Sequence, residues 1–372
     1  MKRTFFLILL LCTSIHAESK YPVDISYLVA DLKYSQEHGV KICEIQHGIL
    51  STYKGDVLMN GGQGFICPKI QQTFAEFPLT KWYVSSDIAF WPLNIVFRNS
   101  PDWKATKSFN DLLKQLPPKQ EIPPENCNDI ASYSGMVYLR KNNSDTYNKL
   151  NSIRPDIIVI DAATHPYWVD KYKMSLLFNL NEDLARIKPE WNLYLKNDVD
   201  TLAERIQQDI PADAYVIKPR GAFLGNGVII ISKDDLDTTL KYIFNKKNHL
   251  EYNPDPAYRQ WGKDHFDSFI VEKYYPSDTI RVEAFENKLY EPSMRAVFIL
   301  SYNNRTIDFR FLGGYLILPR KSIEEEGSLN DLKKAYCRIP YYAEVPEHIL
   351  KEVQQQLEIT MPLLYQEMLE DK

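Results

Sequence analysis

The sequence predicts an α+β protein of two or three lobes. The chain has 372 residues, of which 44% are hydrophobic, so it is long enough to bury more than one core. Strand-length apolar runs occur near both ends of the chain, whereas the apolar segment 156–161 is short and does not alternate with polar residues. Such a run is typical of a strand in a buried parallel sheet. We therefore expect β-rich lobes beside a separate α/β region.

The beginning of the chain resembles a targeting segment. Lys2 and Arg3 precede an apolar run that ends near Ala17, a pattern that predicts a cleavable secretory signal over residues 1–17. An uncleaved anchor is the alternative, but the run is too short to cross a bilayer as a stable helix. We expect an exported protein, periplasmic or secreted, with no stable membrane insertion after cleavage.

Charge and cysteine content exclude some functions. The formal net charge is −5, so nothing in the composition indicates a nucleic-acid partner. The cysteines after the signal segment do not form a CxxC pair, and their spacing does not match a metal-binding motif. Export would permit disulfides, but the pairing cannot be predicted from the sequence. These cysteines are Cys43, Cys67, Cys127 and Cys337.

Secondary structure is predicted along most of the remaining chain. Two strand-length pieces in 23–46 are joined by a turn at 37–39. The C-terminal region 345–369 has a helical pattern that Pro362 is expected to interrupt. Between these ends, a middle region of about 80–165 contains a Pro-rich loop and the strand 156–161. Further helices are predicted over 170–178 and 198–209, and further strands over 191–195, 214–218, 228–232, 268–275, 294–302 and 307–319.

The segment 214–232 has the composition of a phosphate-binding turn. An apolar strand ends in Lys218, and a glycine-containing loop leads to the next strand. Glycines let backbone amides approach phosphate oxygens closely, and a neighbouring lysine adds positive charge. The GxxxxGK[ST] pattern is absent, so this is not a Walker loop, and an ordinary Gly-rich hairpin is the alternative. The glycines are Gly221, Gly225 and Gly227.

A second segment, 270–278, has features that suit a nucleoside. The apolar strand ends in Glu272 and Lys273, and Asp278 follows a few residues later. A strand end of this kind can offer backbone groups to an adenine edge, while a downstream carboxylate accepts ribose hydroxyls. An exposed strand end is the alternative.

The N-terminal hairpin carries oxygen donors where aliphatic residues are expected. With a turn at 37–39, Asp31 and Glu44 lie nearly opposite each other, and Gln46 shares a face with Glu44. Two carboxylates held so close repel each other unless a cation lies between them, and hard oxygen donors suit Mg²⁺. A half-exposed hairpin face with scattered polar residues is the alternative. His47 is a candidate base beside this group, or else a polar loop residue.

Together these motifs resemble the ATP-grasp superfamily of ligases. In that family a lysine, often written Asp-Lys, precedes a second lysine in an apolar-Lys-Pro strand, followed by a Gly-rich loop, an acidic linker and an arginine. Here Lys171 follows Asp170 and precedes Lys218 by 47 positions, with Lys173 as a rival to Lys171.

The resemblance implies a role for each matching residue. It implies that Lys218 and Arg295 act on the phosphates during catalysis and that residues 272–275 form the adenine linker. The implied nucleotide-binding residues are Lys171 or Lys173, Lys218, Gly221, Gly225, Gly227, Glu272, Lys273, Tyr274 and Asp278.

The order of the motifs resembles a circularly permuted subgroup, the glutathionylspermidine synthases and their relatives. Most ATP-grasp members carry the metal site, an Asp followed by Glu-x-Asn, at the C-terminal side of the domain, where this chain has none. The permuted relatives instead open with Glu-x-Asn, and 44-EIQHGILS-51 takes that place here, with Gln46 instead of Asn. The implied cofactors are ATP and Mg²⁺, the latter bound by Asp31, Glu44 and Gln46.

The resemblance also implies a division of the chain and an activity. The expected fold is an ATP-grasp fold, two β-layered lobes around a nucleotide, with an additional α/β lobe. The expected activity is ATP-dependent ligation of a carboxylate to an amine through an acyl phosphate, on small-molecule or peptide substrates. A small-molecule kinase and an exported binding protein without catalysis are the alternatives. The expected segments are 18–79 for the metal-binding hairpin, 80–165 for the α/β lobe, 166–330 for the nucleotide-binding lobes and 331–372 for a C-terminal helical part.

Overall fold

The structure is a computed structural model, and it describes most of the chain beyond the predicted signal segment. Within this part of the chain, no helix is long and apolar enough to cross a membrane. The described residues are 21–48, 53–84, 100, 102–139, 144–197, 199–222, 225–337 and 340–370.

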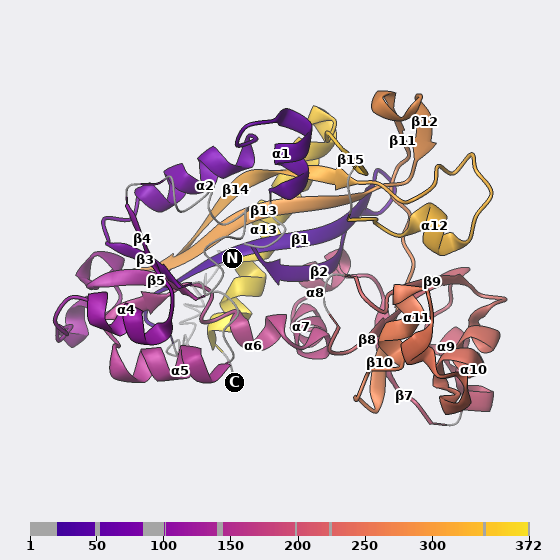
Figure 1. The fold of residues 1–372 in the computed structure, drawn as a ribbon, viewed down its shortest axis with the longest axis horizontal. Helices are drawn as coiled ribbons and strands as arrows, with labels where there is room; N and C mark the ends of the chain where they lie inside the picture. The colour runs from indigo at the N-terminus through magenta and orange to yellow at the C-terminus, as the bar shows by residue number, and fades with distance from the viewer. Residues whose placement is uncertain are drawn as a thin grey trace, which may run out of the picture.

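A five-stranded antiparallel sheet forms the centre of the molecule (Figure 1). Its order is β15-β14-β13-β1-β2, so strands from both ends of the chain are neighbours. The long pairing of β1 with β13 runs from Asp24 opposite Tyr302 to Leu32 opposite Met294. The predicted N-terminal hairpin is therefore confirmed, and it joins the C-terminal strands. The strands are β1 Asp24–Ser35, β2 Gly39–His47, β13 Ser293–Asn303, β14 Thr306–Ile317 and β15 Tyr342–Ala343.

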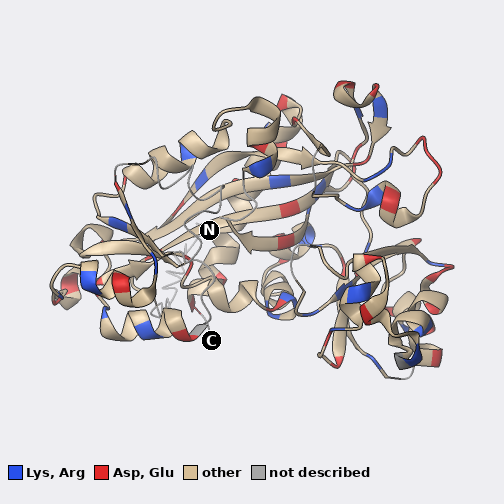
Figure 2. Cartoon of the chain, in the orientation of Figure 1, with Lys and Arg blue, Asp and Glu red and all other residues tan. Residues whose placement is uncertain are grey.

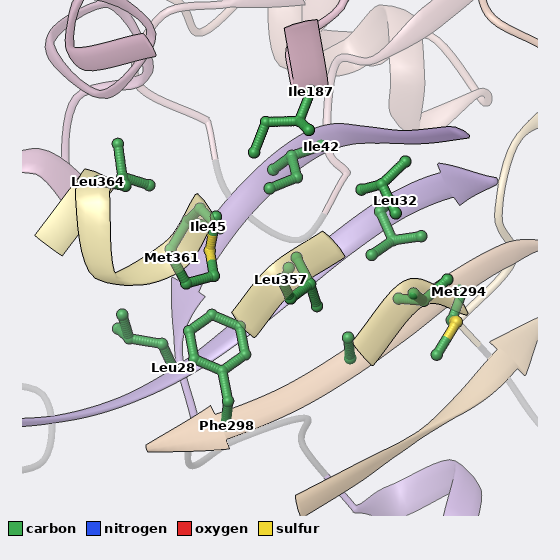
Figure 3. Packing of buried hydrophobic residues seen from close by; sticks show 14 of the residues in the cluster. Leu28, Leu32, Ile42, Ile45, Ile187, Met294, Phe298, Leu357, Met361 and Leu364 are labelled. Atoms are coloured by element: carbon green, nitrogen blue, oxygen red, sulfur yellow. The ribbon is translucent and has the colours of Figure 1, made fainter. Parts of the chain in front are cut away.

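Helices cover one face of this sheet and form the largest core (Figure 3). The long helix α13 (Glu347–Glu370) places Leu357 and Met361 against Leu28 and Phe298 of the sheet. The predicted interruption at Pro362 is wrong, because α13 continues through it. Burial of side chains on both sides of the proline offsets the hydrogen bond that it cannot donate. Shorter helices extend this layer: α6 His165–Trp168, α7 Lys171–Phe178 and α8 Glu182–Ile187.

The opposite face of the sheet packs against an α/β layer. Alternate residues of β1, among them Ile25 and Val29, meet Phe74 of α2 and Met136 of β5 in a second core. The four strands of this layer are parallel in the order β4-β3-β5-β6, so the predicted strand in 156–161 belongs to a parallel sheet as expected. Its elements are α1 Lys54–Asn60, α2 Ile66–Ala75, β3 Lys81–Val84, β4 Trp103–Thr106, α4 Phe109–Gln115, β5 Gly135–Leu139, α5 Ser144–Ile153 and β6 Ile157–Val159.

A second antiparallel sheet forms a lobe of its own, with the order β7-β10-β8-β9. Three helices cover one face of it and enclose a separate core that includes Trp261 and Phe269. The predicted α+β class is confirmed, since two larger antiparallel sheets and a two-stranded one accompany one parallel sheet in the described part of the chain. The segment boundaries stay a prediction. The elements are β7 Trp191–Leu195, α9 Val199–Asp209, β8 Ala214–Pro219, β9 Ile229–Ser232, α10 Leu236–Phe244, α11 Pro256–Trp261 and β10 Ser268–Lys273, followed by the small hairpin of β11 Ile280–Val282 and β12 Lys288–Tyr290 and by α12 Leu329–Lys333.

Candidate functional site

A cavity of about 560 Å³ lies between the two antiparallel sheets. Strands β1, β2 and β13 supply one wall, and β8, β10 and the glycine-containing loop supply the other. Figure 2 shows acidic positions on β1 and β2 beside a basic position on β13. Nine of the predicted catalytic, nucleotide-binding and metal-binding residues line this cavity: Asp31, Glu44, Lys171, Lys218, Gly225, Glu272, Lys273, Tyr274 and Arg295.

The carboxylates of the hairpin are paired with cations from distant elements. Asp31 stands opposite Glu44 on β2 and opposite Arg295 on β13. The Arg295 guanidinium donates from Nε and Nη2 to the two oxygens of Asp31, at 2.7 Å each. Glu44 Oε1 lies 2.9 Å from Lys171 Nζ. Both acids and both bases are therefore neutralised pairwise inside the cavity.

The hairpin residues fit a divalent cation. The amide nitrogen of Gln46 donates to Asp31 Oδ2 and to Glu44 Oε2, at 3.0 Å each. Both carboxylates thus converge on one point, which a hydrogen-bond donor now occupies and where a cation would contact both. No group of three or more His, Cys, Asp or Glu side chains suited to a metal occurs among the described residues. Two carboxylates and an amide suit Mg²⁺, which keeps waters and substrate phosphates as its other ligands.

A buried ion triad joins β8 to β10. Glu272 is 2% exposed, and both of its oxygens are bonded by lysines, Oε1 by Lys188 and Oε2 by Lys218. Lys218 Nζ also donates to the carbonyl of Cys43 on β2 at 3.0 Å. Burial alone would raise the pKa of Glu272, but the two ammonium groups hold it below its usual value. The triad fixes Lys218 between the two sheets.

Lys188 is a functional candidate that the sequence did not indicate. It follows α8 directly and precedes Pro189, in a connection without apolar periodicity. No family motif or spacing marks it, so only the folded chain reveals its contact with Glu272.

The structure separates the two rival lysines of α7. Lys171 opens the helix behind the N-cap Asp170, and its ammonium bonds the carbonyl of Ala222 as well as Glu44. Asp170 is held in turn by Arg220, whose Nε donates to its Oδ1 at 2.9 Å. Lys173 is exposed and does not line the cavity. Lys171 is therefore the better candidate for a phosphate contact.

The three predicted glycines have different surroundings. Gly225 lines the cavity at φ 68°, and a Cβ there would meet no atom within 4 Å, which leaves room for a ligand. A Cβ on Gly221 would approach the Phe266 ring to 2.5 Å, and one on Gly227 would approach Pro219 to 2.3 Å. Neither of these two lines the cavity, and their small size instead permits close packing of the loop.

Two groups predicted to contact the nucleoside have other partners in the structure, and their assignment stays a prediction. The backbone amides of Lys273 and Tyr274 already donate to the carbonyls of Glu190 and Ala214, at 2.8 and 3.0 Å, so these amides are not available to a base. Asp278 lies outside the cavity. The chain leaves the sheet after β10 and turns to the end of β1, where Asp278 Oδ2 accepts from the amide of Gln36 at 2.9 Å. Gln46 contacts the cavity carboxylates but does not line the cavity itself.

Comparison with known proteins gives distant structural likeness only. No protein-family model matches the chain, and no curated protein sequence matches it. D-alanyl-alanine synthetase A from Vibrio cholerae is similar over 61% of this chain and 59% of that chain, with 8% identity and a TM-score of 0.32. The biotin carboxylase domain of 2-oxoglutarate carboxylase from Hydrogenobacter thermophilus, in complex with MgADP, ADP and bicarbonate, is similar over 68% of this chain and 62% of that chain. The identity is 10% and the TM-score 0.32. Biotin carboxylase from Campylobacter jejuni is similar over 81% of this chain and 70% of that chain, with 11% identity and a TM-score of 0.30.

This chain therefore spans about three fifths of the length of the first two structures. At such TM-scores the likeness says nothing about the chemistry of this chain, which has to be inferred from the cavity.

Proposed function

We propose that the protein is an ATP-dependent ligase of the ATP-grasp type, which joins a carboxylate to an amine through an acyl phosphate with Mg²⁺. The observation that carries this proposal is the meeting, in one cavity, of oxygen donors from the N-terminal hairpin with basic residues from far downstream. Asp31 and Glu44 lie beside Lys171 and Arg295, although more than 120 residues separate the hairpin from either base. The pairing of β1 with β13 supports the circularly permuted arrangement.

The pairing of charges suggests how the site works. Phosphoryl transfer needs mainly positioning and charge neutralisation, and no protein nucleophile is required. In the structure Asp31 and Glu44 neutralise Arg295 and Lys171. When nucleotide binds, Arg295 and Lys171 would turn to phosphate oxygens, while the two carboxylates and Gln46 hold Mg²⁺. Mg²⁺ would neutralise the negative charge that develops on the phosphate oxygens during the transfer.

Lys218 has a distinct task in this scheme. Its ammonium is tied to Glu272 and to the carbonyl of Cys43, so it spans the two sheets that enclose the cavity. We propose that it holds phosphate from the side of the glycine-containing loop, with Gly225 leaving space for the oxygens. Because Lys188 also pairs with Glu272, loss of Lys218 would still leave that carboxylate with a buried partner.

The first test is ATP turnover by variants of the cavity. Lys171→Ala, Lys218→Ala and Glu44→Ala should each reduce turnover at least a hundredfold, because each removes a charge that the phosphates or Mg²⁺ need. Lys173→Ala is the matched control on the same helix, and turnover should be unchanged because its side chain is exposed. Circular dichroism would establish that every variant is folded. Full turnover in Lys218→Ala or Glu44→Ala would refute the assignment.

A second measurement separates the proposed ligase from its alternatives. Calorimetry with Mg²⁺ and a non-hydrolysable ATP analogue should show binding, and the absence of any heat of binding would favour an exported binding protein. If ATP is consumed, mass spectrometry of the products should show an amide. A phosphorylated acceptor would instead indicate a kinase. Export through the predicted signal belongs to the proposal, and localisation of a tagged full chain tests it.

A further inference from the structure

A segment after β14 crosses the cavity and supplies part of its lining. This strap, residues 318–337, leaves the sheet at Ile317, and the chain later returns to pair Tyr342 with that same residue. Its short helix α12 packs against β9 of the second sheet. The strap residues that line the cavity are Arg320, Asn330, Asp331, Lys333, Lys334, Ala335, Tyr336 and Cys337.

The strap is bonded to both sides of the cavity. Lys333 pairs with Glu291, and its carbonyl accepts from Lys33 Nζ of β1 at 3.2 Å. The next residue, Lys334, donates from Nζ to the carbonyl of Val228, which follows the glycine-containing loop, at 2.7 Å. Two consecutive residues therefore reach opposite walls, which fixes the position of the Lys334 ammonium.

Lys334 has a different kind of partner from three basic residues that line the same cavity. Lys171, Lys218 and Arg295 each form an ion pair with a carboxylate. Lys334 Nζ bonds a backbone carbonyl, and no carboxylate of the described residues lies within ion-pair distance of it. An ammonium drawn partly out of water with so little compensation favours the approach of an anion.

We propose that Lys334 is an oxyanion-binding residue at the glycine-loop end of the cavity. The ligand group is either the terminal phosphate of the nucleotide or the carboxylate of the acid substrate. Its bond to the Val228 carbonyl places Lys334 there, and both residues line the cavity. This inference rests on the proposed function and adds a binding residue that no motif of the sequence indicates.

The pKa of Lys334 gives the inference a pH signature. Its removal from water lowers the pKa to about 8, Asp255 and Cys337 raise it, and Arg320 lowers it. The ammonium therefore loses its charge as the pH rises through about 8, and anion binding should weaken over the same range. An arginine at this position would stay charged.

Calorimetry on the full chain, with Mg²⁺ present, distinguishes the two ligand groups. If Lys334 holds the terminal phosphate, Lys334→Met should weaken binding of the ATP analogue AMP-PNP at least about tenfold and leave the affinity for ADP unchanged. It should leave both nucleotides unchanged, and weaken acetate binding to the MgADP-loaded protein to a similar degree, if Lys334 holds a carboxylate. In the wild type, the affinity for whichever ligand Lys334 holds, AMP-PNP or acetate, should fall between pH 7 and pH 9. In Lys334→Arg the affinity for that ligand should stay constant.

Two further variants keep the test specific. Lys321→Ala removes a half-buried lysine of the strap, which bonds the Glu326 carbonyl and does not line the cavity. It should change none of these affinities. Asn330→Ala breaks the strap's bond to the Ile230 amide while it keeps every cation. Equal losses in Asn330→Ala and Lys334→Met would overturn the inference in favour of simple anchoring, and so would unchanged binding of both AMP-PNP and acetate in Lys334→Met. Failure of the wild-type protein to bind MgADP would instead refute the proposed function.

Discussion

The two faces of the N-terminal hairpin treat buried charge in opposite ways. On the cavity face, Asp31 and Glu44 have full counter-charges, Arg295 and Lys171. On the opposite face, Asp24 is 1% exposed and its carboxylate is bonded by neutral groups, the hydroxyls of Ser26 and Tyr365 and the amide of Ala163. Asp24 and Asp31 both belong to β1, a strand whose residues alternate between faces.

The residues around Asp24 continue this neutral character. Asp161 is fully buried and accepts from the amide of Tyr27 at 2.7 Å. Burial is the main cause that raises its pKa well above the usual value. Burial and the nearby His165 lower the pKa of His47 well below its usual value, so this ring is neutral and bonds the Thr164 hydroxyl at 3.0 Å. The polar groups on this face bond one another and adjacent backbone, whereas the ion pairs of the cavity can exchange partners with a charged ligand.

The comparison teaches where to look for function on a buried surface. Where acids stay charged, cations from other elements hold them, and a ligand that brings its own charges can replace those partners. Where neutral groups bond the buried acids, the polar groups connect elements of the fold and bring no cation that could pass to a ligand. The same hairpin therefore serves the proposed chemistry on one face and the assembly of the fold on the other.

The largest expected effect is on the charged side. Glu272→Gln should lower the free energy of unfolding by about 3–5 kcal/mol, because it leaves Lys188 and Lys218 buried without a counter-charge. Urea denaturation measures this change. Glu190→Gln is the matched control, since Glu190 pairs with Lys273 at an exposed site and such pairs contribute less than about 1 kcal/mol. Equal losses in the two variants would show that the triad is not charged.

The neutral side predicts a pH dependence of smaller size. Burial is the main cause that raises the pKa of Asp24 from 3.8 to about 6, so the folded protein holds a proton that the unfolded chain releases in this range. The stability of the wild type relative to Asp24→Asn is therefore fully present below pH 4 and should fall by about 3 kcal/mol as the pH rises to 7. Urea denaturation at several pH values tests this slope. Asp200→Asn, at an exposed position of α9, should remove none of it.

The smallest expected effect has the opposite sign. His165 is 3% exposed, and its two ring nitrogens have no hydrogen-bond partner among the residues that the structure describes. Its ring stacks on Tyr147 with a centroid distance of 4.2 Å. His165→Phe keeps the stacking and removes two unsatisfied polar atoms, so it should stabilise the protein by about 1 kcal/mol in thermal or urea unfolding. The exposed His348→Phe should leave stability unchanged. A loss of stability in His165→Phe would mean that its nitrogens take part in bonding.

The sequence contained enough information for the hairpin because its signals are local. The turn at 37–39 and the alternation of the flanking strands determine the register, and Asp31 indeed lies opposite Glu44. The apolar strand before Lys218 and the glycines after it are equally local, and β8 and β9 form as expected.

What the sequence could not indicate depends on contacts between distant segments. Lys188 and Lys334 lie in irregular connections, and their partners, Glu272 and Val228, are more than 80 residues away. Asp278 follows the expected strand, but the chain turns there towards β1, a direction that no pattern in the sequence specifies. Pro362 obeys a local rule that the tertiary packing of α13 overrides.

The position of β1 between β2 and β13 has a consequence for the order of assembly. Asp24 is among the first described residues, yet its strand partner is Tyr302, so the main sheet cannot close until most of the polypeptide exists. The four strands of the second sheet, by contrast, all lie within residues 191–273. Contacts between such remote segments slow folding, because a long loop must close before they form. Strand β1 can pair with β2 at once, but it meets β13 only after the strands of the smaller lobe have been synthesised.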